Sequence, residues 1–287
     1  MRRGSVPLLV ACGALFGLSY VFVRAVVPVL GPVPVTAGRT LIGGVLLLVA
    51  AVAGRHPLRG RPLWSYAILG VLSAAAPFTL ISAAMLSLNA GTAAVLNAST
   101  PAFALAIEAS AARRWPTRRA AAGLVVSWVS VAVVMAQREL GLDRDDLIGL
   151  LLGLAGAAVF AYGAAYAARR FGDVPPLTLA AGQQLGATAA LAPALLVVPA
   201  PTHVTGVAVV QLAALGVLGS GLAYLLFYRL IDREGPVYTS SVTLLVPLFG
   251  VGWGWLLLDE PVPPLSLLGM AGTLLGLRWM LTAKRPL

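Results

Sequence analysis

Two prolines in long apolar stretches each follow a polar residue by four positions. Pro101 follows Asn97 in "VLNASTPAFALAIE", and Pro247 follows Thr243 in "SVTLLVPLFG". In a helix, proline lacks an N–H donor and leaves the carbonyl four residues back without its usual hydrogen bond. Within a bilayer, such a carbonyl is tolerated only against protein or a water-filled cavity. The pair predicts a polar cavity bordered by Asn97 and Thr243; the alternative is that each proline only kinks its helix for packing.

Further polar and aromatic residues lie near the middle of apolar stretches and extend this predicted site. A tyrosine has an apolar ring and one polar tip, which suits contact with an amphipathic small solute. Each tyrosine can equally form an interhelical hydrogen bond or belong to an interfacial belt. The residues predicted to bind substrate are Ser19, Tyr20, Phe78, Thr79, Asn97, Tyr162, Tyr166, Tyr224 and Thr243, with helix breaks at Pro77, Pro101 and Pro247.

Three further polar side chains are predicted to support this site. A charge inside a membrane span is a functional hypothesis by default. Glu108 lies near the inner end of its stretch, where it either pairs with a neighbouring arginine or carries a proton. Arg39 lies about two turns into its stretch, and Gln183 occupies the equivalent place later in the chain. They either bind backbone carbonyls across helices or meet a substrate carboxylate.

Metal and cofactor chemistry is not expected from this sequence. The two histidines, His56 and His203, fall between apolar stretches, and no acid pair lies within them. The single cysteine, Cys12, allows no intrachain disulfide. Its surroundings resemble a lipoprotein cleavage box, but the apolar run continues past it, so we expect a first membrane helix instead.

The elements that position these residues are predicted to be membrane helices. The chain has 287 residues, of which 59% are hydrophobic and 10% charged, whereas a soluble domain is roughly 25% charged. No stretch alternates with period two, so helices are favoured over a barrel. Ten apolar stretches near the length of a span are at approximately 8–27, 33–53, 64–85, 91–110, 120–136, 147–168, 176–198, 207–228, 237–258 and 265–281.

Positive charge sets the predicted orientation. The net charge of +10 comes from short arginine clusters between apolar stretches, which is typical of topology signals and not of a nucleic-acid surface. With a cytoplasmic N-terminus and ten spans, the outer loops hold only Arg138 and Arg144, beside six carboxylates. The inner face then holds Arg2, Arg3, Arg55, Arg59, Arg61, Arg113, Arg114, Arg118, Arg119, Arg169, Arg170, Arg229, Arg233, Lys284 and Arg285. We therefore expect a multi-pass protein of the plasma (inner) membrane with both termini in the cytoplasm.

The chain also shows signs of internal duplication. A shift of 146 residues places Pro101 on Pro247 and Phe78 on Tyr224, and "AILGVL" on "AALGVL". The predicted halves are 1–136 and 147–287, joined by an outer linker at 137–146. Five spans per half make the second copy enter from the opposite side, which is the inverted repeat of secondary transporters.

At these residues the sequence resembles the EamA-type transporters of the drug/metabolite transporter superfamily. The resemblance rests on "LFGLSYVFVRAVV" near the start, on Arg39, and on "LLVPLFGVGWGWLLLDEPVPPLSLLGMAGTLLGL" near the end. Where the family has a glutamate in the first half, this chain has Arg114; the second half keeps Asp259-Glu260. The resemblance implies ten helices, five plus five, around a central cavity, and substrates such as amino acids and other small metabolites, often exported.

The function predicted from these observations is secondary transport by alternating access, with export of amino acids or related compounds as the leading substrate hypothesis. The expected partners are a small-molecule substrate and the lipid bilayer, with the chain a monomer or weak homo-oligomer that binds no nucleic acid. No Walker A motif is present, so ATP is not the expected energy source. The alternatives are a lipid scramblase or flippase, another membrane protein without transport activity, and an intramembrane enzyme. The enzyme is disfavoured because "LGSG" (218–221) lacks the first glycine of a rhomboid-type serine motif.

Overall fold

The computed structural model describes residues 4–55, 61–88, 93, 96–112, 117–135, 144–199 and 204–258, together with 268–269, 271–272, 274–276 and 278–279. Every element in these ranges is helical. Their bounds are α1 (Ser5–Leu30), α2 (Pro32–Ala53), α3 (Leu63–Gly70), η1 (Val71–Ala75), α4 (Ala76–Ala84), α6 (Thr100–Ala112), α7 (Arg118–Met135), α8 (Arg144–Arg170), α9 (Pro176–Leu195), α10 (Gly206–Ala214), η2 (Leu215–Leu222), α11 (Ala223–Glu234), α12 (Pro236–Ser240) and α13 (Val242–Leu258). Several predictions concern residues outside the described ranges: His56, Arg113, Arg114, His203, Asp259, Glu260, most of the linker and most of the tenth stretch.

Six of the described helical runs are long and apolar enough to cross a bilayer. They are Ser5–Leu30, Pro32–Ala53, Leu63–Ala84, Leu147–Arg170, Gly206–Glu234 and Pro236–Leu257. The prediction of an all-helical, multi-pass membrane protein is thereby confirmed. The count of ten spans remains a prediction, because α6 has only 13 residues and α9 carries two adjacent glutamines.

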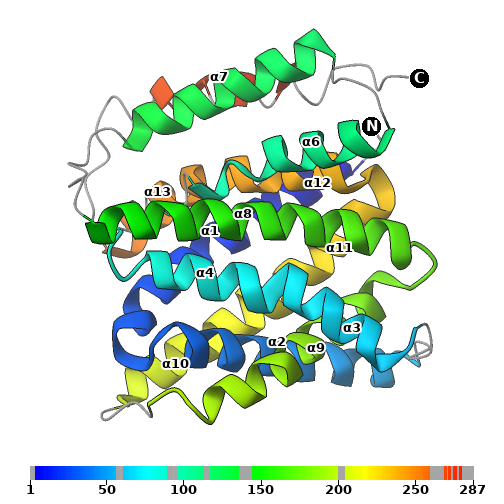
Figure 1. Ribbon diagram of the computed structural model, residues 1–287, viewed down its shortest axis with the longest axis vertical. Helices are drawn as coiled ribbons and strands as arrows, with labels where there is room; N and C mark the ends of the chain where they lie inside the picture. Colours follow the sequence, from blue (N-terminus) through cyan, green and yellow to red (C-terminus); the bar gives the residue numbers. More distant parts are fainter. Residues whose placement is uncertain are drawn as a thin grey trace.

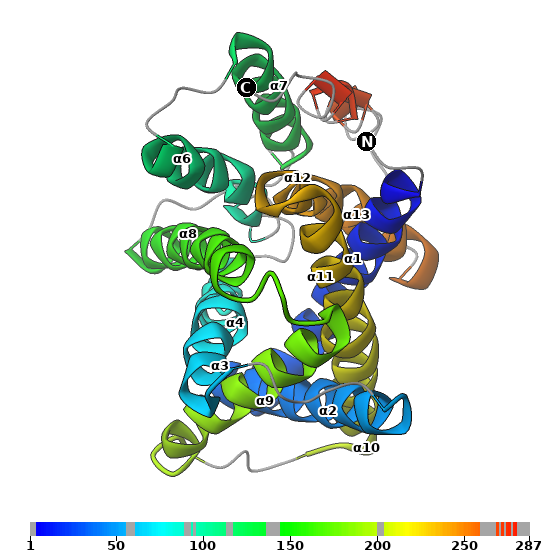
Figure 2. The same cartoon turned by 90° about the vertical axis from the view of Figure 1, so that its right-hand side faces the viewer.

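The helices lie side by side in one bundle, with α2 and α9 at one edge and α7 at the opposite edge (Figures 1 and 2). The most extensive helix contacts join residues of the predicted first half to residues of the second: α1 packs on α13 and α11, α2 on α9 and η2, and α4 on α8. Close approach is possible where glycines face each other, as between α3 and α9. A Cβ added at Gly70 or Gly186 would overlap the backbone of the other helix. The bundle core thus joins residues of the predicted first half to residues of the predicted second half.

Two π-helical segments interrupt the third and eighth predicted spans at matched places. Shifted by 146 residues, η1 falls inside η2. The first lies just before Pro77, which cannot donate to the carbonyl of Ser73. That carbonyl accepts a hydrogen bond from the hydroxyl of Tyr224 in α11 instead. The helix continues through Pro77 with a π-helical segment before it, so the predicted helix break there stays a prediction. The Ser73 carbonyl takes part in packing between the predicted halves.

The fourth predicted span is broken differently from our expectation. The chain turns at residues 98–99 and α6 begins at Thr100, so Pro101 lies in the first turn, where its missing N–H costs nothing. The Asn97 carbonyl is not free, because the Thr100 hydroxyl donates to it at 2.6 Å. The described chain leaves the helical conformation at residues 98–99, just before Pro101, and the helix break predicted at Pro101 stays a prediction.

The ninth predicted span also consists of two pieces, with Ser241 between α12 and α13. Pro247 lies inside α13, as expected. The Thr243 hydroxyl donates to the carbonyl of Ser240 at 2.8 Å, which ties the start of α13 to the end of α12. Both broken spans thus use a threonine hydroxyl to satisfy the backbone at the break.

Polar contacts gather at the right-hand end of the bundle in Figure 1, where α3 begins and α8 and α11 end. Arg61 and Asp173 form an ion pair at 2.6 Å, and Arg61 also donates to the carbonyl of Arg170 at 2.9 Å. Ser5, at the start of α1, donates to Glu234 at the end of α11 at 2.9 Å. Both contacts join the first half of the chain to the second.

Candidate functional site

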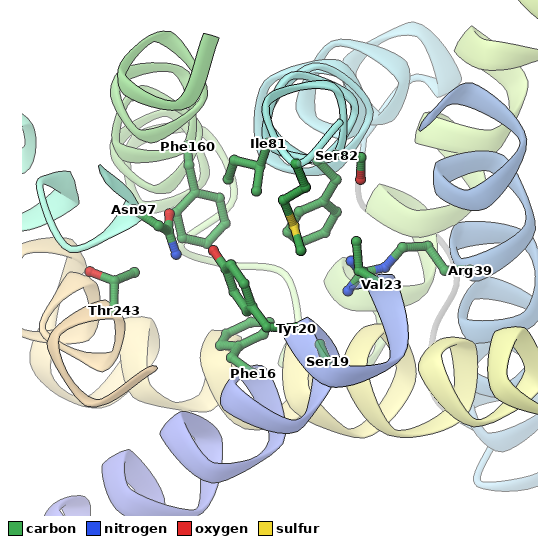
Figure 3. A pocket seen from close by; sticks show the side chains of 12 residues that line it. Phe16, Ser19, Tyr20, Val23, Arg39, Ile81, Ser82, Asn97, Phe160 and Thr243 are labelled. Atoms are coloured by element: carbon green, nitrogen blue, oxygen red, sulfur yellow. The ribbon is translucent and has the colours of Figure 1, made fainter. Parts of the chain in front are cut away.

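A cavity of about 510 Å³, counting the open space at its mouth, lies between the two halves of the chain (Figure 3). It is narrow, because the centre of a water molecule can occupy only about 30 Å³ of it. That corresponds to roughly two waters. The cavity is lined by Phe16, Ser19, Tyr20, Val23, Arg39, Phe78, Ile81, Ser82, Met85, Asn97, Phe160 and Thr243.

Two helices supply most of this lining through the same spacing. On α1 the lining positions begin at Phe16 and recur three, four and seven residues later; on α4 and its C-terminal cap they begin at Phe78 and recur likewise. Residues at this spacing share one face of an α-helix. The local sequence therefore turns one mixed aromatic, aliphatic and hydroxyl face of each helix toward the cavity.

The polar lining residues lie at two separated places in the cavity. At one end the Tyr20 hydroxyl points toward the Asn97 side chain, with Thr243 beside them (Figure 3). At the other end Arg39 extends from α2 toward Val23. Apolar side chains of α1, α4 and α8 lie between the two ends (Figure 3).

Among the described residues of the lining, Arg39 alone is charged, and only 3% of it is exposed. Its Cζ lies 4.0 Å from the ring centroid of Phe78, a cation–π contact. Its Nε donates to Ser220 Oγ at 2.9 Å, and one terminal nitrogen donates to the Gly219 carbonyl at 3.3 Å. Over the described ranges, no carboxylate lies within ion-pair distance of this guanidinium. The site thus holds a buried cation without a counter-charge.

A cluster of aromatic rings closes the cavity on the side of α11. Phe16 and Phe78 both pack edge-on against Tyr224, with ring centroids 5.6 and 5.9 Å away. Phe160 packs against Phe227 at 5.3 Å. Phe16, Phe78 and Phe160 line the cavity, while Tyr224 and Phe227 are buried behind them.

Of the predicted substrate-binding residues, the structure brings together Ser19, Tyr20, Phe78, Asn97 and Thr243 at the cavity, and Arg39 joins them. Binding of a substrate by these residues stays a prediction. None of the three prolines lines the cavity. Asn97 was selected for a carbonyl freed by proline, yet it lines the cavity with its side chain (Figure 3).

Four predicted residues do not line the cavity. Tyr224 is fully buried behind Phe16 and Phe78, and its hydroxyl donates a hydrogen bond to the Ser73 carbonyl. Tyr162 is 50% exposed on the outer surface of α8. Tyr166 packs against Phe171 with ring centroids 6.0 Å apart, and Thr79 is one position off the lining face of α4.

The two other supporting residues also lie away from the cavity. Gln183 is fully buried in α9, and its neighbour Gln184 donates to the Ser220 carbonyl at 3.0 Å. This part of α9 therefore serves helix packing against η2. Glu108 is exposed on α6, and its predicted partner Arg113 lies outside the described residues.

Sequence reasoning missed six lining residues: Phe16, Val23, Ile81, Ser82, Met85 and Phe160. A signal for most of them was available. Residues three or four positions from Ser19, Tyr20 or Phe78 share a helix face with them, and these include Phe16, Val23, Ile81 and Ser82. Met85 is seven positions from Phe78, on the same face. Phe160 carried no comparable signal, because only the contact of α8 with α4 brings it to the cavity.

The lining of the cavity is suited to binding a small molecule. Over the described ranges, no group of three or more histidine, cysteine or carboxylate side chains is placed to hold a metal ion. The lining offers hydroxyl, amide and guanidinium groups around an apolar middle, which suits a small amphipathic molecule. A multi-pass helical bundle with such a cavity between its first and second parts is typical of membrane transporters.

Comparison with known proteins identifies the family within this class. The chain belongs to the EamA-like transporter family, whose model matches residues 4–136 and 147–282. This confirms the resemblance seen in the sequence. The chain is also similar to an uncharacterized transporter of Archaeoglobus fulgidus, with 20% identity over 267 residues that cover 91% of this chain and 93% of the relative. A protein of known crystal structure shares the fold with a TM-score of 0.81 at 17% identity, over 97% of this chain and 96% of the other.

Proposed function

We propose that this membrane transporter is a secondary transporter that moves small metabolites by alternating access. The observation that carries the proposal is the shared wall of the cavity. Ser19, Tyr20, Arg39 and Asn97 come from the first half of the chain, whereas Phe160 and Thr243 come from the second. A relative movement of the halves would change access to every one of these groups.

The contacts around the cavity support such a movement. Arg61–Asp173 and Ser5–Glu234 join the halves at one end of the bundle, beyond the aromatic cluster. The lining residues Val23, Arg39 and Met85 lie toward the other end, where α1 and α4 finish and α2 begins. In this proposal the described conformation is closed at the first end, and the ion pair and hydrogen bond there break when the halves rock.

We further propose ten spans in two inverted halves of five. The two stretches that match the family model, 4–136 and 147–282, support a duplication. The matched π-helical segments η1 and η2 support it as well, since an irregular segment recurs at one place in each half.

The proposed location is the plasma membrane, with both termini in the cytoplasm. The contacts of Arg61 and Arg170 lie at the bundle end where α1 starts and α11 ends, together with Arg233 near Gly4. Positive residues at one end support a cytoplasmic placement of that end. The proposed direction is export, and the proposed substrates are amino acids or related compounds, whose mixed polar and apolar character fits the lining.

The experiment that tests transport uses purified protein in liposomes loaded with a labelled amino acid. We expect counterflow that exceeds protein-free liposomes and that falls when Thr243→Val or Asn97→Leu removes polar groups from the cavity. Tyr162→Phe, outside the cavity, is the matched control. Folded protein that moves no member of a broad amino-acid panel would refute the substrate class. Dithionite quenching of labelled lipids in the same vesicles would identify lipid scrambling instead.

A further inference from the structure

We infer that Arg39 receives a carboxylate of the substrate, and that the substrate is an organic acid with a second polar group at the far end of an apolar body. The inference rests on the proposed transport function and narrows its substrate class. It is carried by three features of one cavity: a guanidinium with no ion-pair partner among the described residues, an apolar part of the lining, and a separate polar cluster.

The first step concerns the charge of Arg39. A cation within a membrane bundle normally pairs with a carboxylate or is satisfied by backbone carbonyls. Arg39 is buried, its ion-pair partner is missing over the described ranges, and a single carbonyl, that of Gly219, accepts from it. A substrate carboxylate would supply the counter-charge when it binds.

The second step concerns the hydrogen-bond donors of the guanidinium. An arginine has five N–H donors in a planar fork that matches both oxygens of a carboxylate. Ser220 Oγ and the Gly219 carbonyl engage two of them. These contacts, with the stacking on Phe78, fix the plane of the fork at the wall of the cavity. The guanidinium is thus held in place before the ligand arrives, which lowers the entropic cost of binding.

The third step concerns the shape of the ligand. In Figure 3, Arg39 lies at one end of the cavity and the polar cluster of Tyr20, Asn97 and Thr243 at the other. The apolar part of the lining includes Phe16, Phe78, Ile81, Met85 and Phe160. An acid with an aromatic or aliphatic body and a hydroxyl or amide at its far end would satisfy both polar places. The described cavity has room for only about two waters, so it must widen as the halves move to admit such an acid. Met85 is the flexible member of this wall and can adjust to the width of the body.

The fourth step concerns the charge of the ligand at its other positions. None of the described residues that line the cavity is acidic. An ammonium group would lose its hydration without gaining an ionic partner, and it would be repelled by Arg39. The cavity therefore favours acids over amines of the same shape.

A purely structural role is the competing explanation for Arg39, because its contacts also tie α2 to η2. The two roles differ in one measurable respect. A structural tie affects stability and all ligands alike, whereas a carboxylate contact sets the preference for an acid over its neutral amide.

The test measures binding to purified protein in nanodiscs by isothermal titration calorimetry. The probes are 4-hydroxyphenylacetate, its neutral amide 4-hydroxyphenylacetamide, and the amine tyramine, which share one aromatic body and far hydroxyl. For the wild type we expect the acid to bind about 30-fold or more tighter than the amide, from the strength of charge-assisted hydrogen bonds. Equal binding of acid and amide, tighter binding of tyramine, or no binding of any probe would overturn the inference.

The variants separate the two roles of Arg39. Arg39→Gln is expected to bring the preference for acid over amide close to one, and Arg39→Lys to retain only part of it because a lysine lacks the fork. Ser220→Ala removes one structural partner and is expected to keep the acid preference. Gln183→Leu, at the equivalent place in α9 but away from the cavity, is the matched control. A full acid preference in Arg39→Gln would refute the inference; if that variant does not fold, a full preference in Arg39→Lys would do so.

The same protein in liposomes distinguishes this inference from the proposed function. Acids that bind through Arg39 but are not moved would refute transport and leave the carboxylate site standing. Counterflow of neutral or cationic solutes, with no Arg39-dependent acid binding, would refute the carboxylate site and leave transport standing.

Discussion

Replacement of Tyr224 by phenylalanine is expected to destabilise the bundle without touching the ligand site. The Tyr224 hydroxyl donates to the Ser73 carbonyl, which receives no backbone donor from residue 77 because that residue is proline. Removing the hydroxyl takes a hydrogen-bond donor from this buried carbonyl, at a cost of about 1–3 kcal/mol. For a chain of this size, each kcal/mol corresponds to roughly 2–4 °C in melting temperature.

A double-mutant cycle tests the cause. Pro77→Ala supplies the N–H that an α-helix would direct at the Ser73 carbonyl, so the hydroxyl of Tyr224 should matter less in that background. The assay is thermal unfolding in detergent for the wild type, both single variants and the double variant. Tyr162→Phe, on the exposed surface of α8, is the control and should melt like the wild type.

Two results would refute this reasoning. Equal costs of Tyr224→Phe with proline and with alanine at residue 77 would mean that the hydroxyl does not compensate for the missing donor. An unchanged melting temperature combined with lost ligand binding would place Tyr224 in the cavity, contrary to its complete burial behind Phe16 and Phe78.

Three further predictions follow from single contacts. Gly219→Ala should weaken binding of the acid probe in calorimetry, because the new Cβ would overlap Ser19 Oγ and approach an Arg39 nitrogen to 3.3 Å. Gly252→Ala, which has open space around it, is the control and should leave binding unchanged. Thr100→Val should lower the melting temperature, because it removes the hydroxyl that donates to the Asn97 carbonyl, at a cost of about 1–3 kcal/mol. Thr79→Val removes a buried hydroxyl without a partner over the described ranges, so it should melt at or above the wild-type temperature. A Thr79→Val protein that melts below Thr100→Val would contradict both predictions. Cys12 is fully buried with its Sγ 3.5 Å from the Ala223 carbonyl, so mass spectrometry should find no maleimide adduct in the folded protein and complete reaction in denaturant.

The sequence carried enough information to predict the membrane fold and part of the site. Apolar length marked the helices, and the positions of Ser19, Tyr20 and Phe78 near the middle of their stretches were sufficient to select residues that line the cavity. Arg39 stood out because charge is rare inside such stretches. These features belong to single helices, so they can be recognised in the sequence without knowing how the helices pack against one another.

The predictions that failed depended on the rotation of a helix about its axis or on a distant partner. Tyr162 and Tyr166 lie at the expected depth on α8, but the packing of α8 against α4 turns Phe160 to the cavity instead. The Tyr224 hydroxyl donates to the Ser73 carbonyl, 151 positions earlier in the chain, and its side chain does not line the cavity. For Pro101, the sequence predicted irregular backbone in this region but not that a helix begins at Thr100, directly before the proline.

The central claim is that one cavity between two halves opens alternately to both faces of the membrane. Its most direct test is the reactivity of Asn97→Cys and Thr243→Cys, one from each half, toward a small membrane-impermeant thiol reagent in right-side-out and inside-out vesicles. Since Cys12 is buried, the native background contributes no signal. We predict that both positions react from both faces and that a bound ligand slows both reactions. Reaction from one face only, or from neither, would contradict the account.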